Sequence, residues 1–120
     1  MSTFDNAVSI HPYFKIQQGQ MEACKVLLGQ FIEKVVNEKN CLHYNFTFNG
    51  DILFCREAYR NADALLEHAE NCGGVFQELL NISTLTRVEI HGPAAELETL
   101  KPAFAELNPD YFVLECGIGR

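Results

Sequence analysis

Apolar residues recur along the chain with two different spacings, which divide it into strands and helices. A spacing of two is typical of strands that bury one face, whereas steps of three and four are typical of amphipathic helices. Strands are predicted where the spacing is two or where a short apolar run lies between turn signals, at residues 8–16, 42–48, 52–59, 84–90 and 111–116. The steps of three and four predict helices at residues 20–39, 61–80 and 93–107.

Turn and cap residues mark several boundaries of these elements. Asn49-Gly50-Asp51 is typical of a hairpin turn, and Asn61 is suited to cap the second helix. The pair Gly73-Gly74 predicts a kink or a split inside that helix. Asn40 is expected to end the first helix in a left-handed conformation, and Pro102 is expected to divide the third helix.

The predicted elements follow the order β-α-β-β-α-β, with a further α-β unit at the end. Two β-α-β units joined by a hairpin are typical of the ferredoxin-like fold, an α+β architecture in which helices cover one face of an antiparallel sheet. We therefore expect a single domain over residues 1–120, with a core at about 8–92 and a C-terminal extension at 93–120.

One face of such a sheet carries no helix, and the alternation predicts its side chains. They are His11, Tyr13, His43, Asn45, Thr47, Arg87, Glu89 and His91. A solvated face is one interpretation. A second copy packed against it is the other, and we favour this homodimer because the set mixes rings, imidazoles and both charges. The histidines lie on three different strands without a zinc-type spacing, so we expect no metal on this face.

The acidic composition narrows the range of partners. Nine basic and sixteen acidic side chains give a net charge of −7, which disfavours nucleic acid and anionic membranes. Apolar runs stay well short of the ~20 residues of a membrane helix, and the N-terminal segment lacks the pattern of a secretory signal. The five cysteines form no C-x-x-C pair. These features predict a cytoplasmic protein in which most of the thiols are buried and reduced.

A resemblance to a known family is carried by residues 54–68, Phe-Cys-Arg-Glu-Ala-Tyr-Arg-Asn-Ala-Asp-Ala-Leu-Leu-Glu-His. A strand ending in Glu-x-aromatic, a polar turn and a helix with a histidine resemble the antibiotic biosynthesis monooxygenase (ABM) domain family, and the aromatic strand 44–48 also fits. The resemblance implies a dimeric α+β barrel with a cavity between sheet and helices. It also implies relatives that oxidise quinols or phenols with dioxygen, and haem-degrading relatives that rely on a tryptophan, which this chain lacks.

His68 is the first candidate for catalysis, because it lies on the apolar stripe of the second helix. The resemblance implies an imidazole that acts as a base or anchors a substrate, and a histidine bonded to the backbone is the structural alternative. Tyr44 and Tyr59 can orient a substrate hydroxyl or pack in the core. Glu57 shares a sheet face with Tyr59, and we expect it to pair with a nearby arginine rather than act as a base.

A cysteine and several aromatic residues complete the set expected around a bound molecule. The predicted substrate-binding residues are Phe46, Phe48, Cys72 and Phe76, and Phe54 is expected to add to the lining. The i,i+4 pair of His68 and Cys72 has a spacing that can hold a metal. Two ligands without a third favour packing, so neither a metal nor a cofactor is predicted. Gly73-Gly74 forms either a hinged entrance or a plain connector.

These residues are compatible with three functions. The favoured hypothesis is a homodimeric, cofactor-independent monooxygenase of the ABM type, acting on a small aromatic or quinol-like substrate that itself supplies the electrons. The alternative is a non-catalytic dimeric barrel that binds a small apolar ligand, or haem through His68. The third is a structural dimer whose cavity has collapsed.

Overall fold

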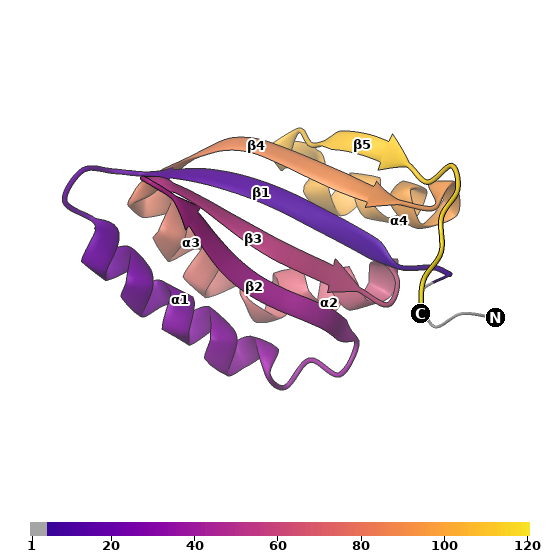
Figure 1. The fold of residues 1–120 in the computed structure, drawn as a ribbon, viewed down its shortest axis with the longest axis horizontal. Coiled ribbons are helices and arrows are strands. Elements are labelled where there is room, and N and C mark those ends of the chain that lie inside the picture. The colour runs from indigo at the N-terminus through magenta and orange to yellow at the C-terminus, as the bar shows by residue number, and fades with distance from the viewer. Residues whose placement is uncertain (1–4) are drawn as a thin grey trace.

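The computed structural model describes residues 5–120, which form one sheet with all helices on one side (Figure 1). The elements in chain order are β1 (Val8–Ile16), α1 (Met21–Val35), β2 (Cys41–Asn49), β3 (Ile52–Tyr59), α2 (Ala62–Asn71), α3 (Gly73–Asn81), β4 (Ser83–Gly92), α4 (Ala94–Phe104), the 3₁₀ helix η1 (Ala105–Leu107) and β5 (Asp110–Val113). The strand order is β2-β3-β1-β4-β5. The first four strands pair antiparallel and β5 runs parallel to β4. The predicted ferredoxin-like α+β fold with an added αβ unit is confirmed.

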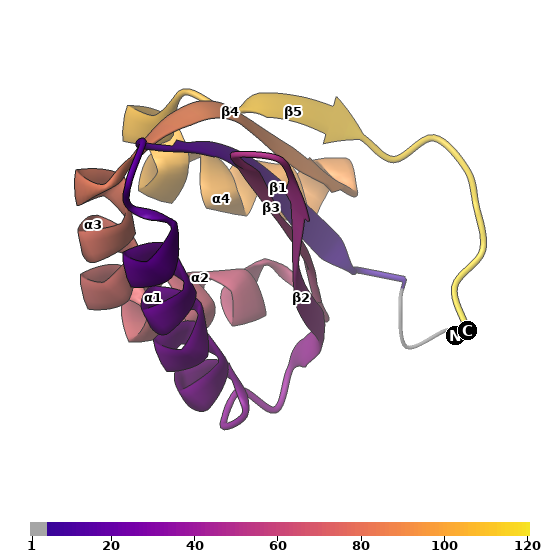
Figure 2. The ribbon, with the colours of Figure 1, turned by 60° about the vertical axis from the view of Figure 1, so that its left-hand side comes forward.

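Alternation along the strands points one set of side chains at the helices, as predicted. In β1 the buried apolar residues Val8, Ile10, Phe14 and Ile16 alternate with more exposed neighbours. The sheet curves around the helices, which lie inside the curve (Figure 2). Two apolar clusters fill this space, one beneath α2 and α4 and the other beneath α1 and α3. The core therefore occupies only one face of the sheet.

The first helix ends earlier than the sequence predicts. α1 stops at Val35, and Glu38 N–H donates to the Val35 carbonyl at 2.9 Å, a tighter i→i−3 bond that takes the chain off the helix axis. Within residues 5–120 only Asn108 combines a positive φ, of 49°, with a side chain, so the left-handed stop predicted at Asn40 is wrong. The early end leaves Glu38 in a turn that faces α2.

Glycines and prolines have unequal effects on the other helices. The predicted split at Gly73-Gly74 is confirmed, because α2 ends at Asn71 and α3 begins at Gly73. The division predicted at Pro102 is wrong, because α4 continues through it to Phe104. A proline removes one backbone hydrogen bond from this last turn, and the buried Phe104 side chain holds the turn against the core.

The C-terminal extension is part of the core. Leu97 and Leu100 of α4 are fully buried in the cluster that also contains Leu65 of α2. The Ala62 N–H at the start of α2 donates to Glu96 Oε1 at 2.9 Å, which ties the two helices together. Across residues 5–120, the helices are too short or too polar to cross a membrane.

Candidate active site

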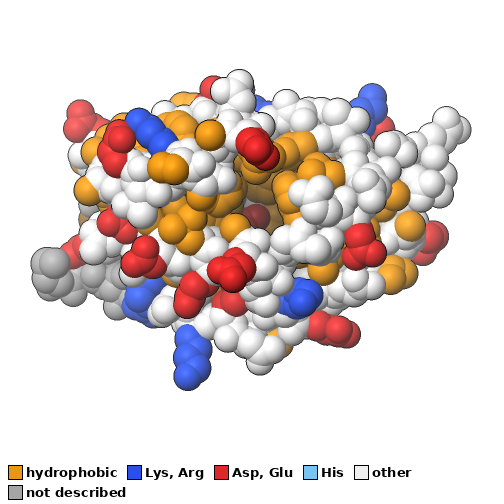
Figure 3. All heavy atoms as spheres, turned by 180° about the vertical axis from the view of Figure 1, so that it is seen from behind, with side chains coloured by type: hydrophobic (Ala, Val, Ile, Leu, Met, Phe, Trp, Pro, Cys, Tyr) orange, Lys and Arg blue, Asp and Glu red, His pale blue; other side chains and the backbone are white. Residues whose placement is uncertain are grey.

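A cavity of about 280 Å³ lies between the sheet and the helices. Most of its lining is apolar and includes Phe14, Phe31, Phe46, Leu65 and Phe76. Figure 3 shows the hollow from the helix side, with apolar atoms on its walls and acidic atoms at its bottom. Four residues of the extension, Ala103, Phe104, Glu106 and Leu107, form part of the wall. The cavity suits a small, largely apolar molecule.

A connected chain of polar side chains borders this cavity. His68 lies in the middle of this chain of side chains. Its Nδ1 is 3.0 Å from both carboxylate oxygens of Glu38, and its Nε2 is 3.5 Å from Glu57 Oε1. The Tyr59 hydroxyl donates to Glu57 Oε1 at 2.6 Å, and the Asn71 amide donates to Glu38 Oε2 at 2.8 Å. The imidazole therefore bridges two carboxylates, each held by its own donor.

The regularity of β3 explains how a carboxylate comes to lie in this apolar space. Leu53, Cys55, Glu57 and Tyr59 alternate along β3 and all point at the helices. The Asn61 cap, whose side chain accepts the Ala64 N–H at 2.9 Å, starts α2 directly after the strand. His68 then lies two turns into α2, with its ring centre 5.1 Å from the Tyr59 ring centre.

Burial controls the electrostatics of the site. It raises the pKa of Glu57 above the ordinary value for a carboxyl, although His68, Tyr59 and Cys55 stabilise the carboxylate. Burial and the nearby Glu57 also raise the pKa of Tyr44, which keeps its phenol protonated. The cavity thus presents a carboxyl–imidazole pair able to hold a shared proton and a neutral phenol able to donate one.

His68 is oriented so that it can accept a proton. A carboxylate only accepts hydrogen bonds, so Nδ1 carries a proton and donates it to Glu38. The other ring nitrogen, Nε2, lies 3.5 Å from Glu57 Oε1, so a proton can move between the ring and this carboxyl. Both ring nitrogens face carboxylates, and a haem iron would have to displace one of them. This disfavours haem ligation by His68.

Most of the residues predicted to contact a bound molecule do line the cavity. They are His68, Tyr44, Phe46, Cys72 and Phe76. The ring of Tyr44 lies 5.1 Å from that of His68, so the imidazole is flanked by Tyr44 and Tyr59. The predicted base and one predicted orienting tyrosine are therefore next to each other.

Three other predicted residues lie elsewhere. Tyr59 is fully buried behind Glu57 and can act on a ligand only through that carboxyl. Phe48 is 40% exposed near the hairpin end of β2 and does not line the cavity. Phe54 points to the open face of the sheet, where its ring centre lies 4.8 Å from that of Tyr13, because its neighbours Leu53 and Cys55 face the helices.

Two features of the site differ from what the sequence predicts. Glu57 does not pair with an arginine, as was expected; it is buried and contacts His68 and Tyr59. A carboxylate at a helix-facing position between apolar residues was the available signal. Glu38 was not considered at all, because it lies 30 positions before His68 and its helix was expected to continue past it.

The cysteines differ in exposure, which makes their reactivity testable. None forms a disulfide within residues 5–120. Cys24, Cys55 and Cys72 are buried, as predicted for most of the thiols, whereas Cys41 is partly exposed and Cys116 is exposed. Burial and nearby carboxylates raise the pKa of Cys41 to about 11. At about pH 8 we expect a chromogenic disulfide reagent to modify one thiol rapidly and the others slowly. Cys116→Ser should remove the fast phase, and its persistence would contradict this assignment.

Comparisons with known proteins place this chain in a family. No family model and no curated protein matches the chain. Among solved structures, MupZ from Pseudomonas fluorescens is 37% identical over 96% of this chain and 95% of its own, with a TM-score of 0.90. A candidate ABM from Caulobacter crescentus CB15 is 19% identical over 72% of this chain and 89% of its own, with a TM-score of 0.65. Another structure described as an ABM is 15% identical over 69% of this chain and 92% of its own, with a TM-score of 0.61.

These matches show the fold class of the chain and, within that class, the family to which it belongs. The fold is that of the ABM proteins, which confirms the resemblance seen in the sequence. Within that class, the chain belongs to the same family as MupZ. The two ABM structures each match about seven tenths of this chain, whereas MupZ matches nearly all of it.

Proposed function

We propose that this protein is an enzyme that deprotonates a hydroxyl group of a small aromatic or quinol-like substrate inside the cavity. The observation that carries the proposal is the buried Glu57–His68–Glu38 chain, which opens on an apolar cavity. A base that is shielded from water and held by carboxylates on both sides is suited to proton transfer at neutral pH. The five unpaired cysteines support a cytoplasmic location, where thiols stay reduced.

The fold class supports oxidation by dioxygen as the step that follows. The quinol gives one hydroxyl proton to the Glu57–His68 pair, and the resulting anion is a stronger reductant. It transfers four electrons to dioxygen in all: one oxygen atom enters a ring carbon, the other leaves as water, and the ring becomes a hydroxyquinone. The substrate supplies all the electrons, so this reaction requires no added cofactor.

A naphthohydroquinone tests this proposal directly. We expect the protein to accelerate dioxygen uptake above the rate of autoxidation, to form a hydroxyquinone, and to incorporate one labelled oxygen atom from ¹⁸O₂. His68→Ala should abolish the acceleration, whereas Glu67→Gln, an exposed change on the same helix, should not. Unchanged autoxidation by a protein that binds the quinol would contradict the oxidative step.

A second candidate is an acid–base reaction that consumes no dioxygen. It is favoured by the Tyr44 phenol, because a neutral donor and the Glu57–His68 base line the same cavity. Such a pair can move a proton between two atoms of one substrate, as isomerisation, hydration or ring closure requires. Turnover that continues at full rate under argon would identify this class.

We also propose that the open face of the sheet is covered by a second copy of the chain. His91 stacks on Phe112 with ring centres 4.5 Å apart, and His11 and Phe54 extend this row of rings. The C-terminal segment after β5 extends on the same side, away from the helices (Figure 2). Its residues Leu114 and Ile118 are exposed. This face offers the aromatic and apolar surface that homodimers bury.

Disrupting this face should produce a monomer. We expect the wild type to sediment as a dimer at micromolar concentration and Phe112→Asp to sediment near 13.5 kDa, because the change buries a charge among rings. Val26→Asp is the control, since Val26 is an apolar residue exposed on α1, on the other side of the sheet. A monomeric wild type would contradict the proposal.

A further inference from the structure

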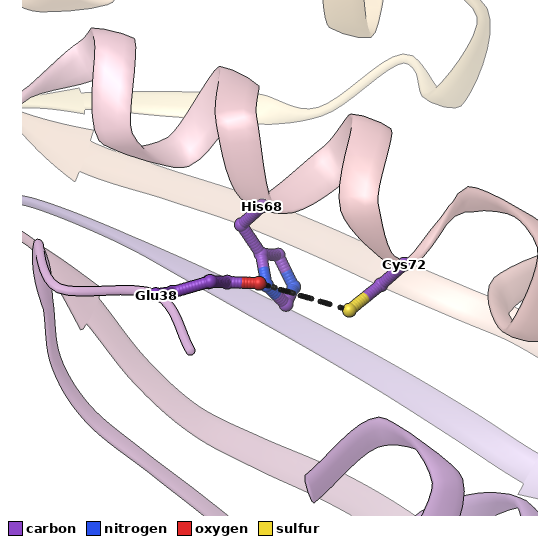
Figure 4. Close-up of side chains that lie close together, drawn as sticks. All are labelled: Glu38, His68 and Cys72. Atoms are coloured by element: carbon purple, nitrogen blue, oxygen red, sulfur yellow. Dashed lines mark hydrogen bonds and ion pairs between the residues drawn. The ribbon is translucent and has the colours of Figure 1, made fainter. Parts of the chain in front are cut away.

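We propose that Glu38, His68 and Cys72 form a binding site for one divalent transition-metal ion of the zinc type. The three side chains converge where the turn after α1 meets the junction of α2 and α3 (Figure 4). Their ligand atoms all lie within 4.8 Å of one another. The sequence offered only the i,i+4 pair of His68 and Cys72, and the fold supplies the third ligand from a distant segment.

The distances between the ligand atoms fit tetrahedral coordination of one ion after small shifts of the side chains. Cys72 Sγ lies 3.8 Å from His68 Nδ1 and 3.9 Å from Glu38 Oε2, and His68 Nδ1 lies 3.0 Å from either Glu38 oxygen. Ideal zinc bonds give edges of about 3.6 Å between sulfur and nitrogen or oxygen, and about 3.3 Å between nitrogen and oxygen. Each pair therefore needs to move by only a few tenths of an ångström.

The donor set selects the class of ion. Thiolate, imidazole and carboxylate together suit Zn²⁺ or Co²⁺, whereas Mg²⁺ and Ca²⁺ prefer sites made only of oxygen atoms. Binding releases the thiol proton of Cys72 to solvent. One thiolate and one carboxylate then neutralise the charge of the ion, which reduces the cost of holding it in a mostly buried place.

An outer layer of hydrogen bonds already orients the ligands. The Asn71 amide donates to Glu38 Oε2 at 2.8 Å and fixes the carboxylate. Glu57 Oε1 lies 3.5 Å from His68 Nε2, on the side of the ring away from the cluster. When the ion takes the place of the proton on Nδ1, the ring carries its proton on Nε2 instead, and Glu57 is placed to accept it, an arrangement common around metal-bound histidines.

The position of the cluster gives the ion access and a vacant coordination position. Glu38 is partly exposed, which provides an entry path, whereas His68 and Cys72 line the cavity. Three protein ligands leave a fourth position for water or a ligand atom, as in catalytic rather than structural zinc sites. The proposal does not rest on the oxidation proposed above, although both use His68.

Cobalt titration of the full chain, after dialysis against a chelator, tests the site. We expect one equivalent of Co²⁺ to bind, with visible absorption typical of tetrahedral cobalt and a near-ultraviolet thiolate-to-cobalt band, and Zn²⁺ to remove both. Cys72→Ser should abolish the thiolate band, and Cys116→Ser, at an exposed cysteine, should retain it. Asn71→Ala should weaken binding about tenfold or more through the loss of its bond to Glu38.

Asn71 is exposed, so its variant keeps the test valid even if Cys72→Ser fails to fold. The proposal is overturned if no equivalent of cobalt binds, if the thiolate band survives in Cys72→Ser, or if Asn71→Ala binds as tightly as the wild type. Quinol oxidation by the chelator-treated protein is measured separately, so that a failed metal site and a failed oxidation are distinguished.

Discussion

Glu57→Gln is expected to lower the rate of naphthohydroquinone turnover by about 10²–10⁴-fold, the range that general acid–base catalysis contributes. Glutamine matches glutamate in shape and can still accept the Tyr59 hydroxyl at Oε1, so the cavity keeps its form. The amide cannot take up a proton, and His68 Nε2 loses the carboxyl that shares one with it. The loss should appear in kcat and leave KM nearly unchanged.

Two further variants separate proton transfer from positioning. Tyr59→Phe leaves Glu57 in place and removes only its donor, so we expect a smaller loss of kcat together with a pH–rate profile shifted to higher pH. Glu67→Gln is the matched glutamate change on the surface of α2 and should retain full activity. Equal kcat values for Glu57→Gln and the wild type would remove Glu57 from the mechanism.

The strands and their faces were predictable because each depends on local alternation. Val8 to Ile16 and Ile52 to Tyr59 have the predicted bounds, and the apolar side of β1 faces the helices as predicted. In β3 the expectation for Phe54 was wrong, because its neighbours Leu53 and Cys55 occupy the helix-facing side. Alternation also placed Glu57 and Tyr59 on one side of β3. What alternation could not reveal was the partner of Glu57, because His68 is supplied by a helix that packs against the sheet only in the folded chain.

The end of α1 was less predictable, and it had the largest consequence for the site. Residues 36–39 contain neither glycine nor proline, so the helix was expected to run to Lys39 and to keep Glu38 on its surface. The tight turn at Glu38 depends on backbone bonds and on packing against α2, which single-residue propensities do not encode. The place of Glu38 in the Glu38–His68–Cys72 cluster could therefore not be predicted before the fold was known.

The extension was predicted as an element but not as part of the cavity. Leu97, Leu100 and Phe104 recur at helical spacing in the sequence, and all three are buried in the structure. Their partner surface on α2 is more than 30 residues away, so nothing local indicated that α4 packs there. The same packing brings η1 and the end of α4 to the cavity wall.

Leu100→Ala is accordingly expected to lower the free energy of unfolding by about 3 kcal/mol, within the range of about 2–5 kcal/mol seen for buried leucines. The Leu100 side chain is 0% exposed, because it points from α4 into the core cluster beneath α2. Its truncation therefore leaves a void that the rigid strands on one side cannot fill. Urea unfolding followed by circular dichroism measures the change. Val26→Ala, a truncation at an exposed residue of α1 away from the open face of the sheet, should change stability by less than about 0.5 kcal/mol.

The same variant connects stability to the cavity. Loosening α4 also loosens Phe104 and the adjoining η1, which form part of the cavity wall, so Leu100→Ala should bind naphthohydroquinone more weakly even where it is fully folded. A cost below about 1 kcal/mol together with a lower denaturant slope would show that α4 unfolds independently of the sheet. In that case the extension would be an appendage, and the cavity would be formed by β1 to β4 and the first three helices alone.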